Sequence, residues 1–430
     1  MLDMNWVRSH AEEVQRISNQ KGIRLDVNEL LLLDDQRRKV LHEVERLRKN
    51  RNNLSDEIGT AVYEKRIEEA AVLKEQARAN NTRLSHLEND LAELQRHFLQ
   101  MSLLIPNTVS PDTPIGGSDA DNVVLRTEGE LPVFDFAARD HVELGRIHGI
   151  IDIPRGVKAA GSRNYYLRGA GVLLHRAVQQ LALDMLIDRG FVPLEVPLLA
   201  TTEAMTNTGF FPLGQDQSYH LDEEDKWLVG TSEVPLVTYY SGEIVDLTSP
   251  IRLAASSICF RSEVGSAGKD VSGLYRVHQF SKVEQIVLCA NDPVQSEALL
   301  QEITRNAEDL LQMLELPYRV MAVCTGDMSQ KTYKQFDIET WMPSRKAYGE
   351  THSSSNLLDF QARRSNIRYR DPNDGTLKFC HSLNNTAVAT PRILIPLLEN
   401  HQREDGSIHI PHALRKYMNG LELLVPQATY

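Results

Sequence analysis

The segment Phe260–Glu284 reads FRSEVGSAGKDVSGLYRVHQFSKVE, and it decides the fold of the larger part of this chain. Both of its ends have the pattern of strands, and a glycine-containing loop joins them, which predicts an antiparallel pair. The first strand carries Arg261, and the second carries Arg276 and Phe280. Arginine offers a planar fork to a carboxylate or phosphate, and phenylalanine offers an aromatic platform to a base. The segment therefore predicts both a sheet and a binding site on it.

The surrounding sequence indicates an α+β body. A helical apolar spacing runs from Leu173 to Arg189 and stops at Gly190. The runs Ile286–Cys289 and Tyr318–Val323 have the β-branched bias of strands. Several strands follow one another instead of alternating with helices. We therefore expect a mainly antiparallel β-sheet flanked by helices, not a doubly wound parallel sheet.

The usual nucleotide-binding loops are missing from the sequence. No GxGxxG follows a predicted strand. The run Gly265–Asp270 resembles a phosphate-binding loop, but only two residues separate its glycines, and Asp270 stands where Ser or Thr would bind magnesium. We interpret it as a glycine-rich loop of another kind.

The N-terminal region has the seam of a coiled coil. Apolar residues recur at heptad spacing on two stretches, and the seam lapses from about Gly59 to Lys65. The pattern predicts an antiparallel helical hairpin, about 27–104, with arms that at 1.5 Å per residue reach roughly 45–60 Å. A plain oligomerisation coiled coil is the alternative. The seam residues are Leu33, Val40, Val44, Leu47, Leu54 and Ile58, then Leu84, Leu87, Leu91, Leu94, Phe98 and Met101.

The charge is distributed unevenly along the chain. The net charge is −12, but the stretch from Asp34 to Gln100 holds 13 basic and 13 acidic residues, so the remainder of the chain carries all of the excess. A polyanion would meet less repulsion at the hairpin than at the body. The first predicted helix also carries a basic cluster, which suits phosphate contacts, although such a cluster is also common on a plain solvated face. Its members are Arg37, Arg38, Lys39, Arg46, Arg48, Lys49 and Arg51.

Length and composition predict a cytoplasmic protein of two domains, 1–110 and 111–430, with an irregular Pro- and Gly-rich segment at 106–121. The N-terminus lacks the apolar core of a signal peptide, and no run of about eighteen apolar residues predicts a membrane span. The cysteines are far apart and lack zinc-ligand spacing, which favours buried thiols in a reducing compartment. They are Cys259, Cys289, Cys324 and Cys380.

Taken in order, these segments resemble the three motifs of the class II aminoacyl-tRNA synthetases. Motif 1 corresponds to about 189–197 (RGFVPLEVP), motif 2 to about 258–284, and motif 3 to about 383–399, which begins LNNTAVATPR. The whole chain is similar to the seryl-tRNA synthetases of the bacterial type. The likeness includes TSEVPL at 231–236, CTGD at 324–327, FQARR at 360–364 and EDGSI at 404–408.

The resemblance implies an enzyme that activates L-serine with ATP and Mg²⁺ and transfers it to tRNA(Ser), and also to tRNA(Sec). It implies catalytic roles for Arg261, Arg392 and Glu350, and magnesium ligands at Glu350 and Ser353. It implies a homodimer formed through motif 1 and tRNA contacts on the arm by Arg37, Arg38, Arg46 and Lys49. The serine site would hold Thr231, Ser232, Glu233, Arg261, Glu284, Asn384 and Thr386; the ATP site would hold Arg261, Ser262, Glu263, Val277, Phe280, Glu350, Thr351, His352, Ser353 and Arg392.

Some residues depart from the family pattern. Ser232 stands where Ala is common, Gln335 and Phe336 stand where Thr and Tyr are usual, and His352 lies in a run that usually reads Ser-Ser-Cys-Ser. No departure removes a charge that the chemistry needs. Three alternatives stay open: a ligase of the same fold that loads a carrier protein, an antibiotic-resistant duplicate of the enzyme, and an inactive coiled-coil scaffold.

Overall fold

The computed structural model describes residues 2–264 and 273–426, which form two compact units. The first unit is Leu2–Pro106 and the second begins at Asn107. The glycine-rich loop at 265–270 lies outside the described residues. No helix in the part of the chain that the structure describes is long and apolar enough to cross a membrane.

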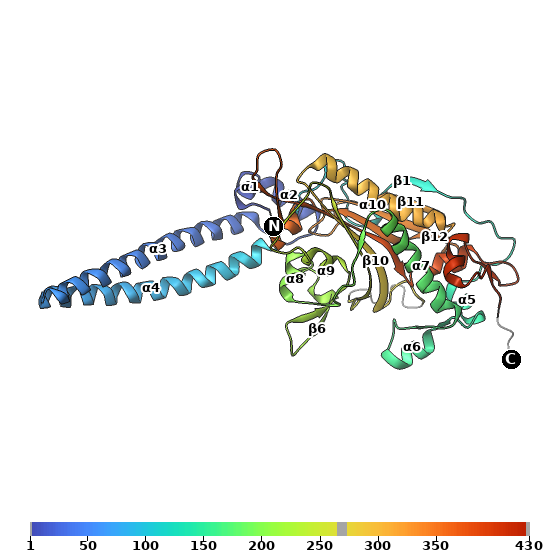
Figure 1. Cartoon of the computed structure of the whole chain (residues 1–430), viewed down its shortest axis with the longest axis horizontal. Helices are drawn as coiled ribbons and strands as arrows, with labels where there is room; N and C mark the ends of the chain where they lie inside the picture. The colour runs from blue at the N-terminus through green and yellow to red at the C-terminus, as the bar shows by residue number, and fades with distance from the viewer. Residues whose placement is uncertain (1, 265–272, 427–430) are drawn as a thin grey trace. The chain divides into compact units, whose positions relative to one another are not determined.

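The first unit is helical. Two short helices, α1 (Met4–Ser9) and α2 (Ala11–Gln20), precede the long pair α3 (Val27–Tyr63) and α4 (Ile67–Ser102). Asp26 caps α3 by accepting hydrogen bonds from the amides of Asn28 and Glu29. The long helices lie side by side as an antiparallel hairpin (Figure 1). This confirms the predicted α-helical hairpin.

The hairpin closes more tightly than the sequence pattern indicates. The seam was expected to lapse from Gly59, but α3 continues to Tyr63 and Ala61 is fully buried. Only residues 64–66 separate the helices, and Lys65 adopts a left-handed φ of 60°. Small Ala61 and Ala70 replace the large seam residues near the tip, which a search for leucines and valines misses. The buried part of the seam is Leu33, Val44, Leu47, Leu54, Leu84 and Leu91.

A buried carboxylate fixes the base of the hairpin. The Asp34 side chain is fully buried. Its carboxylate lies 2.5 Å from the guanidinium of Arg8 on α1, 2.6 Å from that of Arg37 and 3.0 Å from that of Arg38. Burial alone would raise the pKa of the Asp34 carboxyl, but the hydrogen bonds from Arg37 and Arg8 outweigh burial and hold the pKa below its usual value. One acid therefore ties α1 to α3.

The second unit is built on an eight-stranded sheet in the order β1-β11-β12-β13-β16-β10-β9-β4. Every neighbouring pair is antiparallel except β4–β9. This confirms the predicted α+β body on a mainly antiparallel sheet. The bounds are β1 Val123–Glu128, β4 Val192–Pro193, β9 Ile251–Phe260, β10 Gln279–Cys289, β11 Tyr318–Ala322, β12 Lys334–Met342, β13 Ala347–Asn356 and β16 His381–Thr390.

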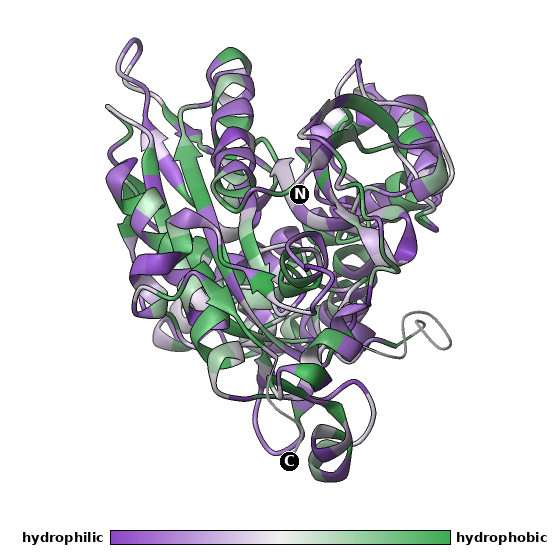
Figure 2. Ribbon diagram, turned by 90° about the vertical axis from the view of Figure 1, so that its right-hand side faces the viewer, coloured by the Kyte–Doolittle hydropathy of each residue, from purple (hydrophilic) through white to green (hydrophobic). Residues whose placement is uncertain are grey.

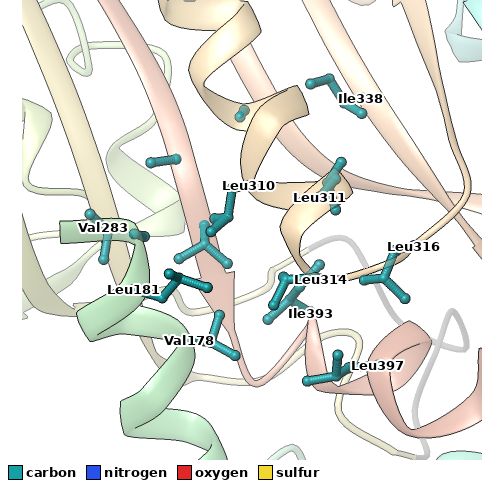
Figure 3. Packing of buried hydrophobic residues seen from close by; sticks show 14 of the residues in the cluster. Val178, Leu181, Val283, Leu310, Leu311, Leu314, Leu316, Ile338, Ile393 and Leu397 are labelled. Carbon is teal, nitrogen blue, oxygen red and sulfur yellow. The ribbon is translucent and has the colours of Figure 1, made fainter. Parts of the chain in front are cut away.

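Helices α7 (Ala170–Asp188) and α10 (Pro293–Met313) cover one face of this sheet. Val178 and Leu181 of α7 pack near Val283 of β10, together with Leu310 of α10 and Leu314, which directly follows α10 (Figure 3). The long strands carry extended hydrophobic stretches, whereas the helices mix both kinds of residue (Figure 2). Each fully buried leucine stabilises the fold by about 1.5–3 kcal/mol.

Smaller elements complete the second unit. The four cysteines are buried and free, as the sequence predicts for structural thiols. The remaining helices are α5 His141–Ile147, α6 Ile153–Ala160, α8 Thr202–Asn207, α9 Glu233–Thr238, α11 Phe360–Ser365, α12 Leu394–Asn400 and α13 His412–Arg415, and the remaining strands are β2 Ile151–Asp152, β3 Tyr166–Leu167, β5 Leu199–Ala200, β6 Tyr219–Leu221, β7 Lys226–Leu228, β8 Ile244–Val245, β14 Arg368–Arg370, β15 Leu377–Phe379, β17 Ile408–His409 and β18 Leu423–Leu424.

Replacing Asp34 with Asn should loosen the base of the hairpin. The substitution leaves three guanidinium groups without their shared carboxylate, and because those groups are partly exposed we expect a loss of about 2 kcal/mol. In the unaltered chain this stabilisation is complete above the unfolded pKa of about 3.9 and is lost as pH falls through the lower folded pKa. Hydrogen exchange of the α1 amides at pH 7 measures the change.

Asp35→Asn is the matched control. Asp35 is half exposed and contacts the same Arg8 at 2.7 Å, so its loss should change exchange little. Equal effects of the two substitutions would contradict the role assigned to burial.

Candidate functional site

One pocket, open to solvent, is lined by residues on or next to β9, β10, β13 and β16. Thr386 and Lys282 line it, whereas the alternate residues Asn385 and Val283 are buried on the other side of their strands. The pocket therefore occupies the face away from α7 and α10. It gathers ten of the residues singled out in the sequence: Arg261, Glu263, Val277, Phe280, Glu350, Thr351, His352, Ser353, Thr386 and Arg392.

The β9–β10 ladder positions the first group. Cys259 pairs with Phe280. Two residues further along the chain, the backbone amide of Arg261 donates to the carbonyl of His278 at 2.9 Å. The Arg261 guanidinium consequently lies 5.2 Å from the centre of the Phe280 ring. A cation beside an exposed aromatic face can hold a phosphate and a base at the same time.

Glu263 follows with a left-handed φ of 52°, which for a residue with a side chain costs roughly 1–2 kcal/mol. Its carboxylate lies 3.5 Å from Arg276. Ser262, in contrast, does not line the pocket, and its hydroxyl donates to the carbonyl of Asp216 at 2.7 Å. The turn therefore aims Glu263 into the pocket and Ser262 away from it.

A second cationic group stands at the opposite wall. Arg392, which follows β16, donates to the carbonyls of Tyr275 at 3.1 Å and Glu350 at 3.2 Å. The Tyr275 ring packs against Arg392 at 4.5 Å and against Arg345 at 4.4 Å. Sequence spacing did not point to Tyr275 or Arg345, because the contacts of the Tyr275 ring with Arg392 and Arg345 are made only by the fold.

Oxygen ligands for a cation are available beside Arg392. Glu350 is half exposed at the pocket, and Ser353 lines it three residues along the same strand. Gln335 donates to Ser353 at 3.2 Å and to Asp337 at 2.9 Å. Burial, and then the charge of Glu350, raises the pKa of Asp337 to about 8. A cation held here would favour the ionised form of these carboxyls.

Two buried charge pairs lie next to the pocket. Lys282 contacts Glu284 at 2.5 Å, and Thr386 donates to Glu284 at 3.4 Å. Lys331 contacts Glu233 at 2.5 Å. Burial is the largest effect on the pKa of Glu284 and raises it. Burial is also the largest effect on the pKa of Lys331, but because the charged form is a cation, burial lowers it. The sequence singled out both carboxylates but neither lysine.

The other polar residues of this region are placed as follows. The Thr231 hydroxyl accepts from the Glu233 amide at 3.2 Å, which fixes the loop before α9. The Ser232 side chain is fully buried. Asn384 shares the strand face of Thr386 by alternation. None of these three lines the pocket in the described residues.

His352 is nearly fully buried although it borders the pocket. Burial lowers its pKa to about 3, so the ring is neutral at pH 7. The ring nitrogen Nδ1 lies 2.8 Å from the Thr351 hydroxyl. A neutral, packed imidazole fits a space-filling role better than a contact with phosphate.

Most of the basic residues singled out on the hairpin have acidic partners. Arg37 and Arg38 are held by Asp34, and Arg46 pairs with Glu43 at 2.7 Å. Lys49 is exposed and makes no ion pair with any residue in 2–264 or 273–426.

The back of the pocket is a hydrogen-bonded network that sequence analysis missed. Gln285 donates to Asn385 at 2.6 Å, Asn385 donates to the Ser354 hydroxyl at 2.6 Å, and Asn306 donates to Gln285 at 2.8 Å. All four side chains are essentially inaccessible to solvent. The network joins β10, β13, β16 and α10, so it fixes the strands that carry the pocket residues.

Comparisons with known proteins agree along the whole chain. Residues 1–109 match the family described as the seryl-tRNA synthetase N-terminal domain, and residues 218–401 match the class II tRNA synthetase core domain for G, H, P, S and T. The chain is 43% identical to the serine–tRNA ligase of Deinococcus radiodurans over 428 residues, 99% of each protein. Crystal structures of seryl-tRNA synthetase from Pyrococcus horikoshii complexed with ATP (37% identity, TM-score 0.89, 100% of both chains) and of cytoplasmic serine–tRNA ligase from Naegleria fowleri with AMP (28% identity, TM-score 0.83, 100% and 99%) are also similar.

Asn385→Ala should destabilise the second unit by about 2–4 kcal/mol, because the substitution leaves the buried groups of Gln285 and Ser354 unpaired, each at a cost of about 1–3 kcal/mol. Urea unfolding followed by circular dichroism measures the midpoint. Asn384→Ala, one residue earlier on the pocket face, is the matched control and should change the midpoint far less. Equal shifts would contradict the two-faced arrangement of β16.

Proposed function

Because this chain belongs to the seryl-tRNA synthetase family, we propose that its pocket activates L-serine with ATP and that the protein transfers the serine to tRNA(Ser). The observation that carries the proposal is the convergence of Arg261, Phe280, Glu350 and Arg392 on one pocket, beside the buried carboxylates that the sequence assigns to serine. The family likeness supplies the substrates, and the pocket supplies groups that suit them.

ATP would lie along the part of the pocket between Arg261 and Arg392. Phe280 offers a face for the adenine, and Glu263 and the backbone of Val277 border the same space. Arg261, held over that ring, is positioned to neutralise both the serine carboxylate and the α-phosphate. Arg392, anchored on two carbonyls, would bind the far phosphates.

Magnesium would be held by Glu350 and Ser353 together with phosphate oxygens. The residues fit this ion because hard cations prefer oxygen ligands and Mg²⁺ commonly takes only one or two protein carboxylates beside substrate phosphates. No cluster of three or more His, Cys, Asp or Glu able to hold a metal occurs in residues 2–264 and 273–426, which agrees with a site completed by substrate. When bound, the ion would neutralise charge on the phosphates.

The serine site would lie at Glu284 and Thr386, with Thr231, Ser232, Glu233 and Asn384 around it. Glu284 can accept from both the ammonium and the hydroxyl of serine. A buried site built to bond a hydroxyl discriminates against an analogue that lacks it by roughly 10⁴-fold, because its polar groups are left unpaired. Alanine should therefore be a very poor substrate.

The reaction needs no covalent enzyme intermediate. A serine carboxylate oxygen attacks the α-phosphorus and pyrophosphate leaves, which gives seryl-adenylate. A terminal ribose hydroxyl of tRNA then attacks the activated carbonyl and AMP leaves. The residues of the pocket act by orientation and by neutralising the charge that develops at the α-phosphate.

We further propose that the helical hairpin binds the tRNA by shape and backbone, that tRNA(Sec) is also charged, and that the protein is a cytoplasmic homodimer joined through 189–197. Family likeness supports these proposals, and the four free buried thiols agree with a reducing compartment. Among the four basic residues singled out for tRNA, Lys49 is the best placed, because acidic neighbours occupy the others. A carrier-protein loader would have no use for such a hairpin.

Serine-dependent exchange of labelled pyrophosphate into ATP tests activation. We expect exchange with serine and little with threonine, alanine or glycine. Arg261→Gln should lower the exchange rate by about 10²–10³-fold, since it removes a charge that acts on the transition state. Arg252→Gln is the control: Arg252 lies on β9, which ends directly before Arg261, but it pairs with Glu302 at 2.9 Å, outside the pocket. Normal exchange by Arg261→Gln would contradict the assignment.

Shortening the hairpin tests tRNA binding. Replacing residues 44–87 with a short glycine–serine turn keeps Asp34 and its arginine partners. We expect wild-type serine-dependent exchange but loss of tRNA charging, and Lys49→Glu in the full chain should weaken charging alone. Charging at the wild-type rate by the shortened protein would show that the hairpin has another role, whereas exchange without any charging by the full chain would favour a different acceptor.

A further inference from the structure

Lys331 is a buried lysine that the reaction described above does not use. It lies in the segment between β11 and β12, and its side chain is 9% exposed. The ammonium group contacts Glu233 at 2.5 Å and lies 3.9 Å from the centre of the Phe210 ring. A charged group is removed from water only where strong partners replace its hydration, so these contacts define its position closely.

The backbone around Lys331 is also fixed. The side-chain Nδ2 of Asn107 donates to the Lys331 carbonyl at 2.9 Å. Gly209 has a φ of 82°, and a Cβ there would come within 3.2 Å of the Lys331 side chain. A glycine is needed at this point both for its left-handed conformation and for the passage of the lysine stem.

One carboxylate oxygen of Glu233 is held by two neighbours. Its Oε1 atom accepts from Lys331 and also from Gln361 at 2.7 Å, while Gln361 accepts from Ser382 at 2.9 Å. Glu284 also contacts one lysine, Lys282, at 2.5 Å, but its hydrogen bond from Thr386 is longer, at 3.4 Å. The two pairs sense each other: the charge of Glu233 raises the pKa of Glu284 and the charge of Lys331 lowers it, after the larger effects of burial and Lys282. Two lysines thus balance two carboxylates.

We propose that Lys331 is a positioning residue that sets amino-acid specificity: it occupies Glu233 and leaves Glu284 as the carboxylate that receives the ammonium of the substrate. This inference rests on the proposed function of the pocket. Without Lys331, Glu233 becomes a second buried carboxylate that attracts cations, and the pocket then favours an amino acid with an additional positive charge. The lysine therefore helps the pocket select a neutral hydroxyl side chain.

The probe is L-2,3-diaminopropionate, in which an amino group replaces the hydroxyl of serine. Pyrophosphate exchange with each amino acid gives kcat/KM and its ratio. Lys331→Met keeps the length of the side chain and removes the charge, so the preference for serine over diaminopropionate should fall at least about tenfold, with the KM for ATP unchanged. Lys334→Met is the control: the Lys334 side chain is 12% exposed, and its carboxylate partners are Asp112 and Glu297 instead of Glu233.

Two further variants separate this role from mere packing. In Glu233→Gln, the freed Lys331 should turn to Glu284 and raise the KM for serine. Removing the lysine as well, in the double variant Glu233→Gln with Lys331→Met, should lower that KM again and abolish any gain for diaminopropionate. Because the double variant carries no unpaired buried charge, it remains informative if Lys331→Met alone does not fold.

The outcomes are distinct. An unchanged ratio in folded Lys331→Met, or a serine KM that the second substitution does not improve, overturns the role of Lys331 and leaves the proposed function intact. A fall in ratio shared by Lys334→Met overturns it as well. Absence of serine-dependent exchange in the unaltered protein overturns the proposed function itself.

Discussion

The alternation of side chains along β10 and β16 is the constraint on which the second unit depends. On β10, Glu284 faces the pocket and Gln285 faces α10, and on β16 the same holds for Thr386 and Asn385. A shift of either strand by one residue would exchange these faces and would bury a carboxylate among leucines. The buried amides make that slip costly, because each would lose its partners. The hydrogen bonds of Gln285 and Asn385 therefore fix the register that places Glu284 and Thr386 on the pocket face.

The same constraint explains why the charged groups of the pocket come in balanced sets. Arg261 and Arg392 are half-sheltered and rest on aromatic rings and carbonyls, so their charge stays available to a ligand. The lysines beside the pocket are paired with carboxylates at 2.5 Å. The two arginines are therefore available to bind a phosphate, whereas Lys282 and Lys331 neutralise buried carboxylates of the protein. Such preorganisation avoids reorienting dipoles during the reaction.

The sequence predicted the elements that depend on a repeating pattern or on residues close together in the chain. Heptad spacing located the hairpin, and the strand–loop–strand pattern at 260–284 located the antiparallel pair that bears Arg261 and Phe280. Motif likeness then named carboxylates such as Glu233 but not their partners. Lys331 is 98 residues from Glu233 in sequence, and Arg8 is 26 residues from Asp34, so no spacing rule connects them. Pairings of this kind arise only once the fold has brought the elements together.

The hairpin shows how charge counts in sequence can mislead. The basic cluster on α3 suits a phosphate-binding face, yet intramolecular acids neutralise much of it: Asp34 holds Arg37 and Arg38, and Arg48 reaches across to Glu88 on α4 at 2.7 Å. Exposed pairs of this kind contribute little stability, so a polyanion can displace them at small cost, whereas the pairs to buried Asp34 cannot be displaced without loosening the base. Beyond the base, the helices are held together by apolar side chains and the Asn50–Asn80 hydrogen bond at 2.9 Å, so the proposed contact with a polyanion would fall on this outer part of the hairpin.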